Sequence, residues 1–295
     1  MTSTARTRRD ARLLVACEDR PGIVAATSGF LAARGANLLG ASQHTTDPEG
    51  GTFFMRMAFR LPGTPDAPDA AALRAAFDAE VATPFGMDAR LVVDPHPRRT
   101  AILVSKADHA LLELLWRWRN GELDADVRVV ISNHDALRDV VEGFGVPFVH
   151  LPIEPGAKEA QEARIEQRLA DDAIELVVLA RYMQILSPGF VARWPQRIVN
   201  IHHSFLPAFV GAAPYRQAYE RGVKRIGATA HYVTHELDQG PIIAQDVAPV
   251  SHRDSVRDLV RIGKEVERTV LARAVDAHLA DAILVHGNKT VVFDA

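Results

Sequence analysis

The sequence has a single cysteine, no long apolar run and no strong excess of charge of either sign. One cysteine, Cys17, excludes a disulfide framework within the chain and a cysteine-based zinc site, which is typical of a protein from a reducing cytoplasm. No window approaches about 18 uninterrupted apolar residues, so we expect no membrane-spanning segment. The first ten residues lead into an alternating stretch rather than an apolar segment, so we expect no signal peptide.

The charge balance gives no sign of a nucleic-acid surface. Lys and Arg total 34 against 37 Asp and Glu, and the formal charge of -3 provides no basic footprint. We therefore expect a cytoplasmic protein with no nucleic-acid partner and no membrane partner. Apolar residues are plentiful: they make up 47% of 295 residues, which is enough for a core in each of about two domains.

A proline-containing stretch at residues 95–98 is predicted to link two domains, 11–94 and 99–295, because proline lacks an amide donor and disfavours helix in its predecessor. Upstream, the apolar spacing predicts strands at 12–17, 36–44, 52–60 and 88–93 and helices at 23–33 and 67–82, with a turn at 48–51. This βαββαβ order is that of a ferredoxin-like unit.

The first strand-to-helix loop reads D-R-P-G-I at 19–23, and G-A-N-L follows at 35–38. This pattern resembles the ACT family of small regulatory domains over residues 11–94. The resemblance implies a homo-oligomer with an amino-acid effector, such as glycine or methionine, bound near Asp19, Arg20, Pro21, Gly22 and Asn37. The same loop also fits a tight turn in which Asp19 caps the helix.

Downstream, strand and helix signals alternate. Strands are predicted at 100–104, 127–131, 147–150, 176–179 and 197–201, and helices at 109–119, 136–144 and 157–171. Alternation of this kind predicts an α/β domain with a doubly wound, mostly parallel sheet. Ser255 to Asp258 resembles a capping box that opens a helix to about His278, and Gly287-Asn288 is expected to turn a terminal hairpin.

Polar residues end the strand at 197–201. Asn200 and His202 are two apart and share a face, whereas Ile201 and His203 are expected to face the other way. Doubly wound sheets bind their ligands at the carboxyl ends of strands, and an amide donor beside an imidazole suits an oxygen that gains negative charge. Asp238 follows in a later loop beside glycine, which taken alone is more typical of a turn.

Two longer motifs that contain these residues identify a protein family more specifically than the residues do one by one. N-I-H-x-S-x-L-P at 200–207 and H-Y-V-x-x-x-L-D-x-G-P-I at 231–242 resemble the folate-dependent formyltransferase family, over residues 99–295. The resemblance implies that Asn200, His202 and Asp238 are the catalytic trio and that folate is a substrate, with no tightly bound cofactor. The match at 180–188 resembles the pterin-pocket loop and implies substrate contacts from Arg181, Tyr182, Met183, Ile185 and Leu186.

Members of this family differ in the acceptor: a sugar-phosphate amine, the amine of a charged tRNA, or water. The stretch at 105–109 contains no glycine to cradle a phosphate, and Asp108 would repel one. The attached ACT unit, the pair His202-His203 and S-N-H at 132–134 resemble the deformylase branch, in which water is the acceptor. We therefore predict hydrolysis of 10-formyltetrahydrofolate to formate and tetrahydrofolate. The alternatives are transfer to an amine, or an amino-acid-sensing binding protein with an inactive second domain.

Two mechanisms fit the trio. Either Asn200 and protonated His202 donate to the oxyanion while Asp238 deprotonates the water, or His202 is the base and Asp238 orients it. No metal site is predicted, because His231 and His235 would lie roughly 13 Å apart on an extended strand. His203 and His231 are interpreted as supporting or packing residues.

Overall fold

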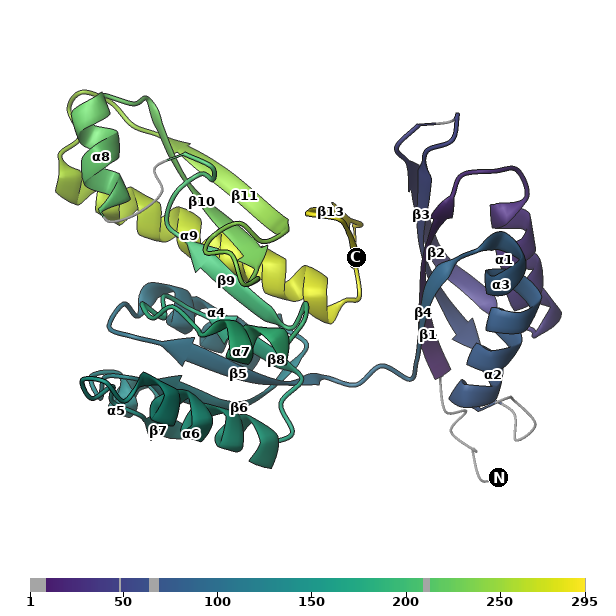
Figure 1. Cartoon of the computed structure of the whole chain (residues 1–295), viewed down its shortest axis with the longest axis horizontal. Coiled ribbons are helices and arrows are strands. Elements are labelled where there is room, and N and C mark those ends of the chain that lie inside the picture. The colour runs from purple at the N-terminus through teal and green to yellow at the C-terminus, as the bar shows by residue number, and fades with distance from the viewer. Residues whose placement is uncertain (1–8, 48, 64–68, 209–212, 295) are drawn as a thin grey trace. The chain divides into compact units, whose positions relative to one another are not determined.

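A computed structural model of the chain describes residues 9–47, 49–63, 69–208 and 213–294. The described residues form two compact units, whose elements are labelled in Figure 1. The first comprises the described residues up to His96 with Asp281–Leu284 and those from Val291 onward. The second comprises Pro97–Ala280 with Val285–Thr290.

The first unit is built on a four-stranded antiparallel sheet of order β2-β3-β1-β4. Its elements are β1 (Arg9–Glu18), α1 (Ile23–Ala33), β2 (Asn37–Thr45), β3 (Thr52–Leu61), α2 (Ala70–Phe77), the π-helical turn η1 (Asp78–Ala82), α3 (Thr83–Phe85) and β4 (Asp88–Val93). The predicted ferredoxin-like order of strands and helices is confirmed.

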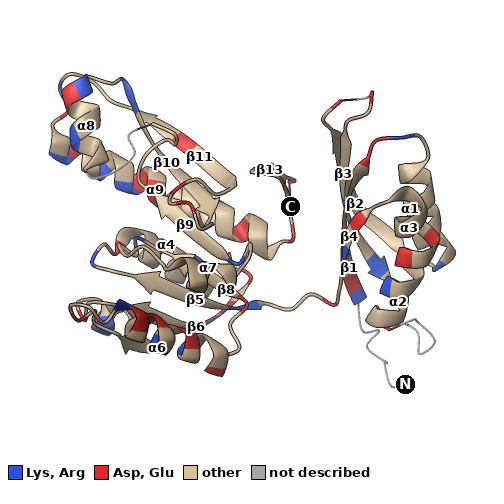
Figure 2. Cartoon of the chain, viewed as in Figure 1, with Lys and Arg blue, Asp and Glu red and all other residues tan. Residues whose placement is uncertain are grey.

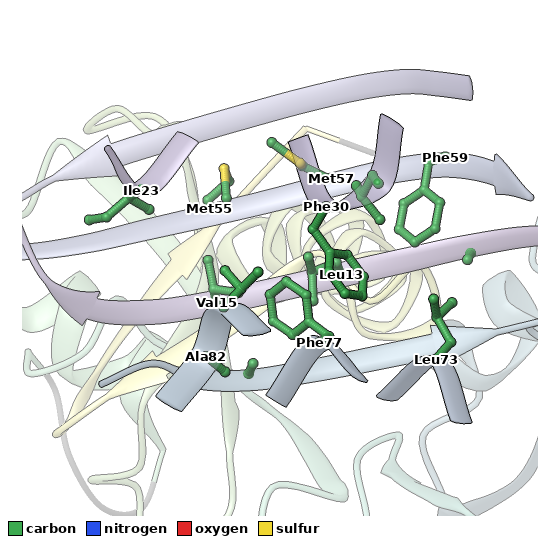
Figure 3. Close-up of a cluster of buried hydrophobic side chains, with 14 of the residues drawn as sticks. Leu13, Val15, Ile23, Phe30, Met55, Met57, Phe59, Leu73, Phe77 and Ala82 are labelled. Carbon is green, nitrogen blue, oxygen red and sulfur yellow. The ribbon is translucent and has the colours of Figure 1, made fainter. Parts of the chain in front are cut away.

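One face of this sheet and its helices enclose a hydrophobic core, shown in Figure 3. Because neighbouring strand residues point to opposite faces, every second residue of β1 and β3 enters it, including Leu13, Val15 and Met57. Phe30 of α1 meets Phe77 of α2 edge to face, with ring centroids 5.2 Å apart. That geometry is the favourable one for two aromatic rings, so it helps to fix the two helices against each other.

Two details of the first unit differ from the prediction. The helix expected at 67–82 begins at Ala70, where Asp69 caps it by accepting from the amide of Ala72 at 2.6 Å. It then changes to η1 and continues as α3 to Phe85. Residues 67 and 68, and residue 48 of the predicted turn, lie outside the described residues.

The capping role expected for Asp19 is wrong. Gly22 is the N-cap of α1, with φ +96° and no side-chain cap, while Pro21 and Gly22 form the predicted turn. A φ of this sign is left-handed, and glycine adopts it without the steric cost that a side chain brings.

The second unit contains a seven-stranded sheet of order β11-β10-β9-β8-β5-β6-β7. The strands from β9 to β7 are parallel, and β10 and β11 extend the sheet in antiparallel fashion. The strands are β5 (Arg98–Val104), β6 (Ala125–Ser132), β7 (Phe148–His150), β8 (Leu176–Leu179), β9 (Ile198–His202), β10 (Arg225–Tyr232) and β11 (Ile242–Pro249). The mostly parallel sheet predicted from the alternation is thereby confirmed.

Helices cover both faces of this sheet. They are α4 (His109–Arg119), α5 (Arg138–Glu142), α6 (Lys158–Asp171), α7 (Pro188–Ala192), α8 (Pro214–Arg221) and α9 (Val256–Leu279). Helices α6 and α7 pack with one face of the strands, whereas α4 and α9 contact each other and α9 runs along β9, β10 and β11. All four residues of β8 are buried, as expected for a strand covered on both sides.

The remaining differences concern short elements. Helices α7 and α8 and strand β11 were not predicted, and the helix expected at 136–144 is only Arg138–Glu142. The predicted terminal hairpin is confirmed as β12 (Ile283–His286) and β13 (Lys289–Val292).

Acidic and basic residues both occur on α6 and α8 (Figure 2). No helix among the described residues is long and apolar enough to cross a membrane.

The predicted capping box of α9 is confirmed and yields a stability prediction. Ser255 Oγ accepts from the amide of Asp258 at 3.3 Å, and the Asp258 carboxylate accepts from the amide of Ser255 at 3.0 Å. Ser255→Ala should lower the free energy of unfolding by about 1 kcal/mol, measured by urea titration followed by circular dichroism. Thr269→Ala, on the exposed middle of α9, is the control and should cause no loss. An unchanged midpoint for Ser255→Ala would show that the cap contributes nothing.

Candidate active site

The candidate site lies at the carboxyl edge of the second sheet. From β5 the chain proceeds outward through β6 to β7, then returns to β8 and β9 on the other side of β5. Such a reversal of strand order opens a crevice at the strand ends. Loops that follow β8, β9 and β10 line a cavity of about 260 Å³ there. All eight residues predicted as catalytic or substrate-binding line this cavity: Asn200, His202, Asp238, Arg181, Tyr182, Met183, Ile185 and Leu186.

The predicted trio is brought together by two strands of opposite direction. Asn200 and His202 lie at the end of β9, and Asp238 lies in the loop after β10. His202 Nδ1 is 3.2 Å from Asp238 Oδ2. His202 is 6% exposed, and its Nε2 has no hydrogen-bond partner among the described residues. Because a carboxylate only accepts, Nδ1 carries the proton and Nε2 of the neutral ring keeps a lone pair.

His231, interpreted from the sequence as a supporting or packing residue, belongs to this cluster and lines the cavity. The antiparallel register of β9 and β10 pairs it directly with Asn200. His231 Nδ1 lies 2.9 Å from the carbonyl oxygen of Tyr232, which can only accept, so Nδ1 carries the proton. Its Nε2 therefore accepts from Asn200 Nδ2 at 3.2 Å. The imidazole consequently fixes which way the Asn200 amide faces.

Asp238 remains ionised over the neutral pH range. The hydrogen bond from His202 holds the pKa of this carboxyl well below its usual range. Half burial acts in the opposite direction but does not outweigh that hydrogen bond. A carboxylate with so low a pKa is a weak base. Its geometry suits it to orient His202 and to balance a positive charge there.

The loop that carries Asp238 is tightly folded. Asp238 has φ +56°, in the left-handed region that a non-glycine residue enters only at a cost. Two residues later, a Cβ on Gly240 would lie 1.8 Å from the carbonyl oxygen of Tyr232, so only glycine fits. The loop therefore passes directly over the end of β10, which places the carboxylate beside the two imidazoles.

The loop after β8 forms an apolar side of the cavity. Tyr182 and Leu186 are buried, whereas Met183 and Ile185 are 56% and 60% exposed. Two buried polar side chains, Ser105 and Glu162, hold this loop in place through hydrogen bonds to its backbone. Ser105 Oγ accepts from the amide of Met183 at 3.0 Å, and Glu162 accepts from the amide of Ser187 at 2.9 Å. An exposed apolar pair on a supported loop suits a flat aromatic ligand.

The strand alternation predicted that His203 faces away from the site, and this prediction is wrong, because His203 lines the cavity. Strand β9 ends at His202, and the ring centroids of His202 and His203 are only 5.4 Å apart. Burial, followed by the nearby charge of Arg181, lowers the pKa of His203 to about 4. The His203 ring is therefore neutral at neutral pH.

The residues expected to contact an effector lie in the first unit. Asp19, Arg20, Pro21 and Gly22 form the connection between β1 and α1, and Asn37 is the first residue of β2. Arg20 stacks over the ring of Phe85 at 4.6 Å and donates to the carbonyl of Pro84, so its side chain is already engaged within the unit. In the described parts of the chain, no three or more His, Cys, Asp or Glu residues are grouped to hold a metal ion.

The chain is similar to known protein families and to named relatives. A family model described as Formyl transferase matches residues 98–275, and one described as ACT domain matches residues 11–75. The chain belongs to the formyl transferase family. It is 55% identical to the formyltetrahydrofolate deformylase of Mycobacterium tuberculosis over 282 residues, 96% of this chain and 90% of that protein. It is 51% identical to that of Bacillus subtilis over 283 residues, 96% of this chain and 93% of that protein.

A solved structure agrees with these relatives. The crystal structure of a formyltetrahydrofolate deformylase from Pseudomonas syringae superposes with a TM-score of 0.91 and 49% identity, covering 97% of this chain and 95% of that one. The match includes the ACT region as well as the formyl transferase region. Family membership over almost the whole length is therefore shown, as the two motifs and the ACT pattern predicted.

The close approach at Gly240 gives a prediction about this loop. Gly240→Ala should destabilise the second unit by about 1–3 kcal/mol, because the added methyl group overlaps the Tyr232 carbonyl. Gly189→Ala is the matched control, since its Cβ meets only the end of the Arg193 side chain at 3.7 Å. Urea unfolding of both variants measures the difference. Equal midpoints would mean that the loop does not need glycine.

Proposed function

We propose that this chain hydrolyses 10-formyltetrahydrofolate to formate and tetrahydrofolate. The observation that carries the proposal is the cluster of Asn200, His202 and Asp238 in one cavity of a chain that matches deformylases over nearly its full length. An inactive binding protein would have no need to keep all three groups in one cavity.

The cavity fits a folate. Its apolar side, with Tyr182, Met183, Ile185 and Leu186, would receive the pterin ring, and Arg181 lies at the same wall. Leu237, 55% exposed, offers a further apolar contact from the Asp238 loop. The formyl group would then lie at the polar end, beside Asn200 and His202. The ligand is a substrate, so the proposed reaction needs no tightly bound cofactor.

The proposed chemistry uses groups of this chain alone. One hydrogen of Asn200 Nδ2 is directed to His231, and the other is free to donate to the formyl oxygen as it gains negative charge. His202 Nε2 accepts a proton from the attacking water, whose oxygen bonds to the formyl carbon. When the bond from carbon to N10 breaks, His202 returns a proton to N10. Asp238 orients the ring and stabilises the imidazolium, as the low pKa of Asp238 supports.

The donor role of Asn200 is tested by truncation. Asn200→Ala should lower kcat by on the order of 10²- to 10³-fold, because a lost oxyanion donor costs that much. Asn120→Ala, at the exposed end of α4, is the control and should retain the wild-type rate. Formate release under saturating substrate measures both. A folded Asn200→Ala variant with wild-type kcat would remove Asn200 from the mechanism.

The acceptor is tested by a second assay. Wild-type protein and 10-formyltetrahydrofolate, with no amine present, should yield formate and tetrahydrofolate in equal amounts. Asp238→Asn should lower this rate at least as strongly as Asn200→Ala, because the imidazolium loses its counter-charge. No formate without an amine, but formylated product once glycinamide ribonucleotide is added, would establish a transferase instead. Amino-acid binding with no turnover under either condition would establish a binding protein.

For the first unit we propose an amino-acid effector, glycine or methionine, in a cytoplasmic homo-oligomer. The match of residues 11–75 to the ACT domain supports regulation by an amino acid. Gly22 and Asn37 are exposed, so a ligand can reach them. Titration of each amino acid against formate release distinguishes the two candidates.

A further inference from the structure

A buried carboxylate contacts Arg181, one of the residues that line the active-site cavity. Glu267 of α9 is 1% exposed and accepts from Tyr215 Oη at 2.5 Å and from His109 Nε2 at 2.9 Å. Arg181 Nε forms an ion pair with it at 3.4 Å. Burial would raise the pKa of Glu267, but the hydrogen bond from His109 and the charge of Arg181 lower it, so the group is ionised. The proposed catalytic steps do not use this group.

This cluster borders the active site. Arg181 lines the same cavity as Asn200, His202 and Asp238. His203 also lines it, and its ring lies 6.0 Å from that of Tyr215. His203 and Tyr215 line a second, smaller cavity of about 30 Å³ as well. Of these residues, His203 lines both spaces, Arg181 lines the larger and Tyr215 the smaller, and Glu267 contacts both Arg181 and Tyr215. We call these four residues the Arg181–Glu267 wall.

Arg181 is an unfavourable residue for its position. Its φ is +64°, a conformation that glycine adopts freely and a side chain does not. Its side chain is only 15% exposed, and Nε and Nη1 make no hydrogen bond to a described residue. A buried cation with unsatisfied N–H groups is costly. Glu267 already receives hydrogen bonds from Tyr215 and His109, so it does not depend on Arg181 for its donors.

Backbone strain and unsatisfied polar groups of this kind collect at functional sites. We propose that Arg181, held by Glu267, determines the acceptor of the formyl group. Its guanidinium lies at the wall of the cavity, close enough to His203 for its charge to act on that ring, and in this proposal it excludes an amine from the formyl carbon while admitting water. This inference rests on the proposed hydrolysis, which uses the same cavity.

The reaction that the wall is proposed to prevent is formyl transfer to an amine, which forms and breaks bonds at the same carbon as hydrolysis does. The nitrogen of a neutral amine would bond to the formyl carbon, and the bond from that carbon to N10 would break. The proton lost by the amine would reach N10 through His202. The products would be a formamide and tetrahydrofolate, with no net redox change. The trio can serve this reaction equally well, so only access to the carbon separates the two outcomes.

Substitution of Arg181 by glycine tests the inference. Arg181→Gly removes the guanidinium and suits the left-handed backbone. The assay supplies 10-formyltetrahydrofolate and glycinamide, at a pH at which that amine is largely uncharged, and measures N-formylglycinamide and formate after subtraction of the uncatalysed reaction. We expect the ratio of formamide to formate to rise at least tenfold over wild type. Gln196→Gly is the matched control, because Gln196 also has positive φ, +55°, but is exposed. Its ratio should equal that of wild type.

A second variant keeps the test decisive. Glu267→Gln retains an acceptor for Tyr215 but removes the charge that holds Arg181, so its product ratio should also rise. If Arg181→Gly folds and its ratio stays at the wild-type value, Arg181 does not select the acceptor. If Arg181→Gly does not fold, by circular dichroism, an unchanged ratio in Glu267→Gln overturns the inference and a raised ratio supports it. Formate release by wild type without glycinamide tests the hydrolysis separately, and its absence would overturn both proposals.

Discussion

The antiparallel pairing of β10 with β9 is the constraint on which the site depends. Residues 200 to 202 and residue 238 are far apart along the chain, and only this pairing brings them into one cavity. Its register sets His231 opposite Asn200, and the turn beyond Tyr232 returns Asp238 toward His202. A shift of one residue would send the His231 side chain to the other face of the sheet. The amide of Asn200 would then lose the group that orients it.

Two carboxylates act on the histidines in different ways. Asp238 is half buried, touches the cavity and holds a proton on Nδ1 of His202. Glu267 is fully buried and binds Arg181, whose charge lies near His203 and helps to keep that ring neutral. The site therefore places a histidine that can accept a proton beside one that stays uncharged. His202 and His203 are adjacent in the sequence, and the groups around each ring give the two histidines these different protonation properties.

Much of this arrangement could be predicted from the sequence. The period of two along a strand places Asn200 and His202 on one face, and the alternation of strands and helices predicts a mostly parallel sheet. Asp238 became a candidate only through the second motif, because a loop aspartate beside glycine is usually a turn residue. His231 was interpreted as a supporting or packing residue, but its contact with Asn200 was not predicted, because nothing local shows that β10 runs antiparallel and pairs His231 with Asn200. The position of His203 was wrong because the period of two ends where the strand ends, and no sequence signal marks that residue.

The choice of formyl acceptor is the property of the site that depends least on Asn200, His202 and Asp238 themselves. In the proposed mechanism, Asn200, His202 and Asp238 stabilise an oxyanion and move a proton, and both steps are the same whether water or an amine attacks. The choice between these nucleophiles must therefore come from groups that border the formyl carbon without taking part in the chemistry. Arg181 and Glu267 are suited to this because both are charged: Glu267 is buried and held by Tyr215 and His109 from two different helices, and Arg181 is paired with Glu267. Because Glu267 is held by groups from α4 and α8 and itself belongs to α9, the proposed wall has support from three helices, which is the kind of support that exclusion of a larger nucleophile requires.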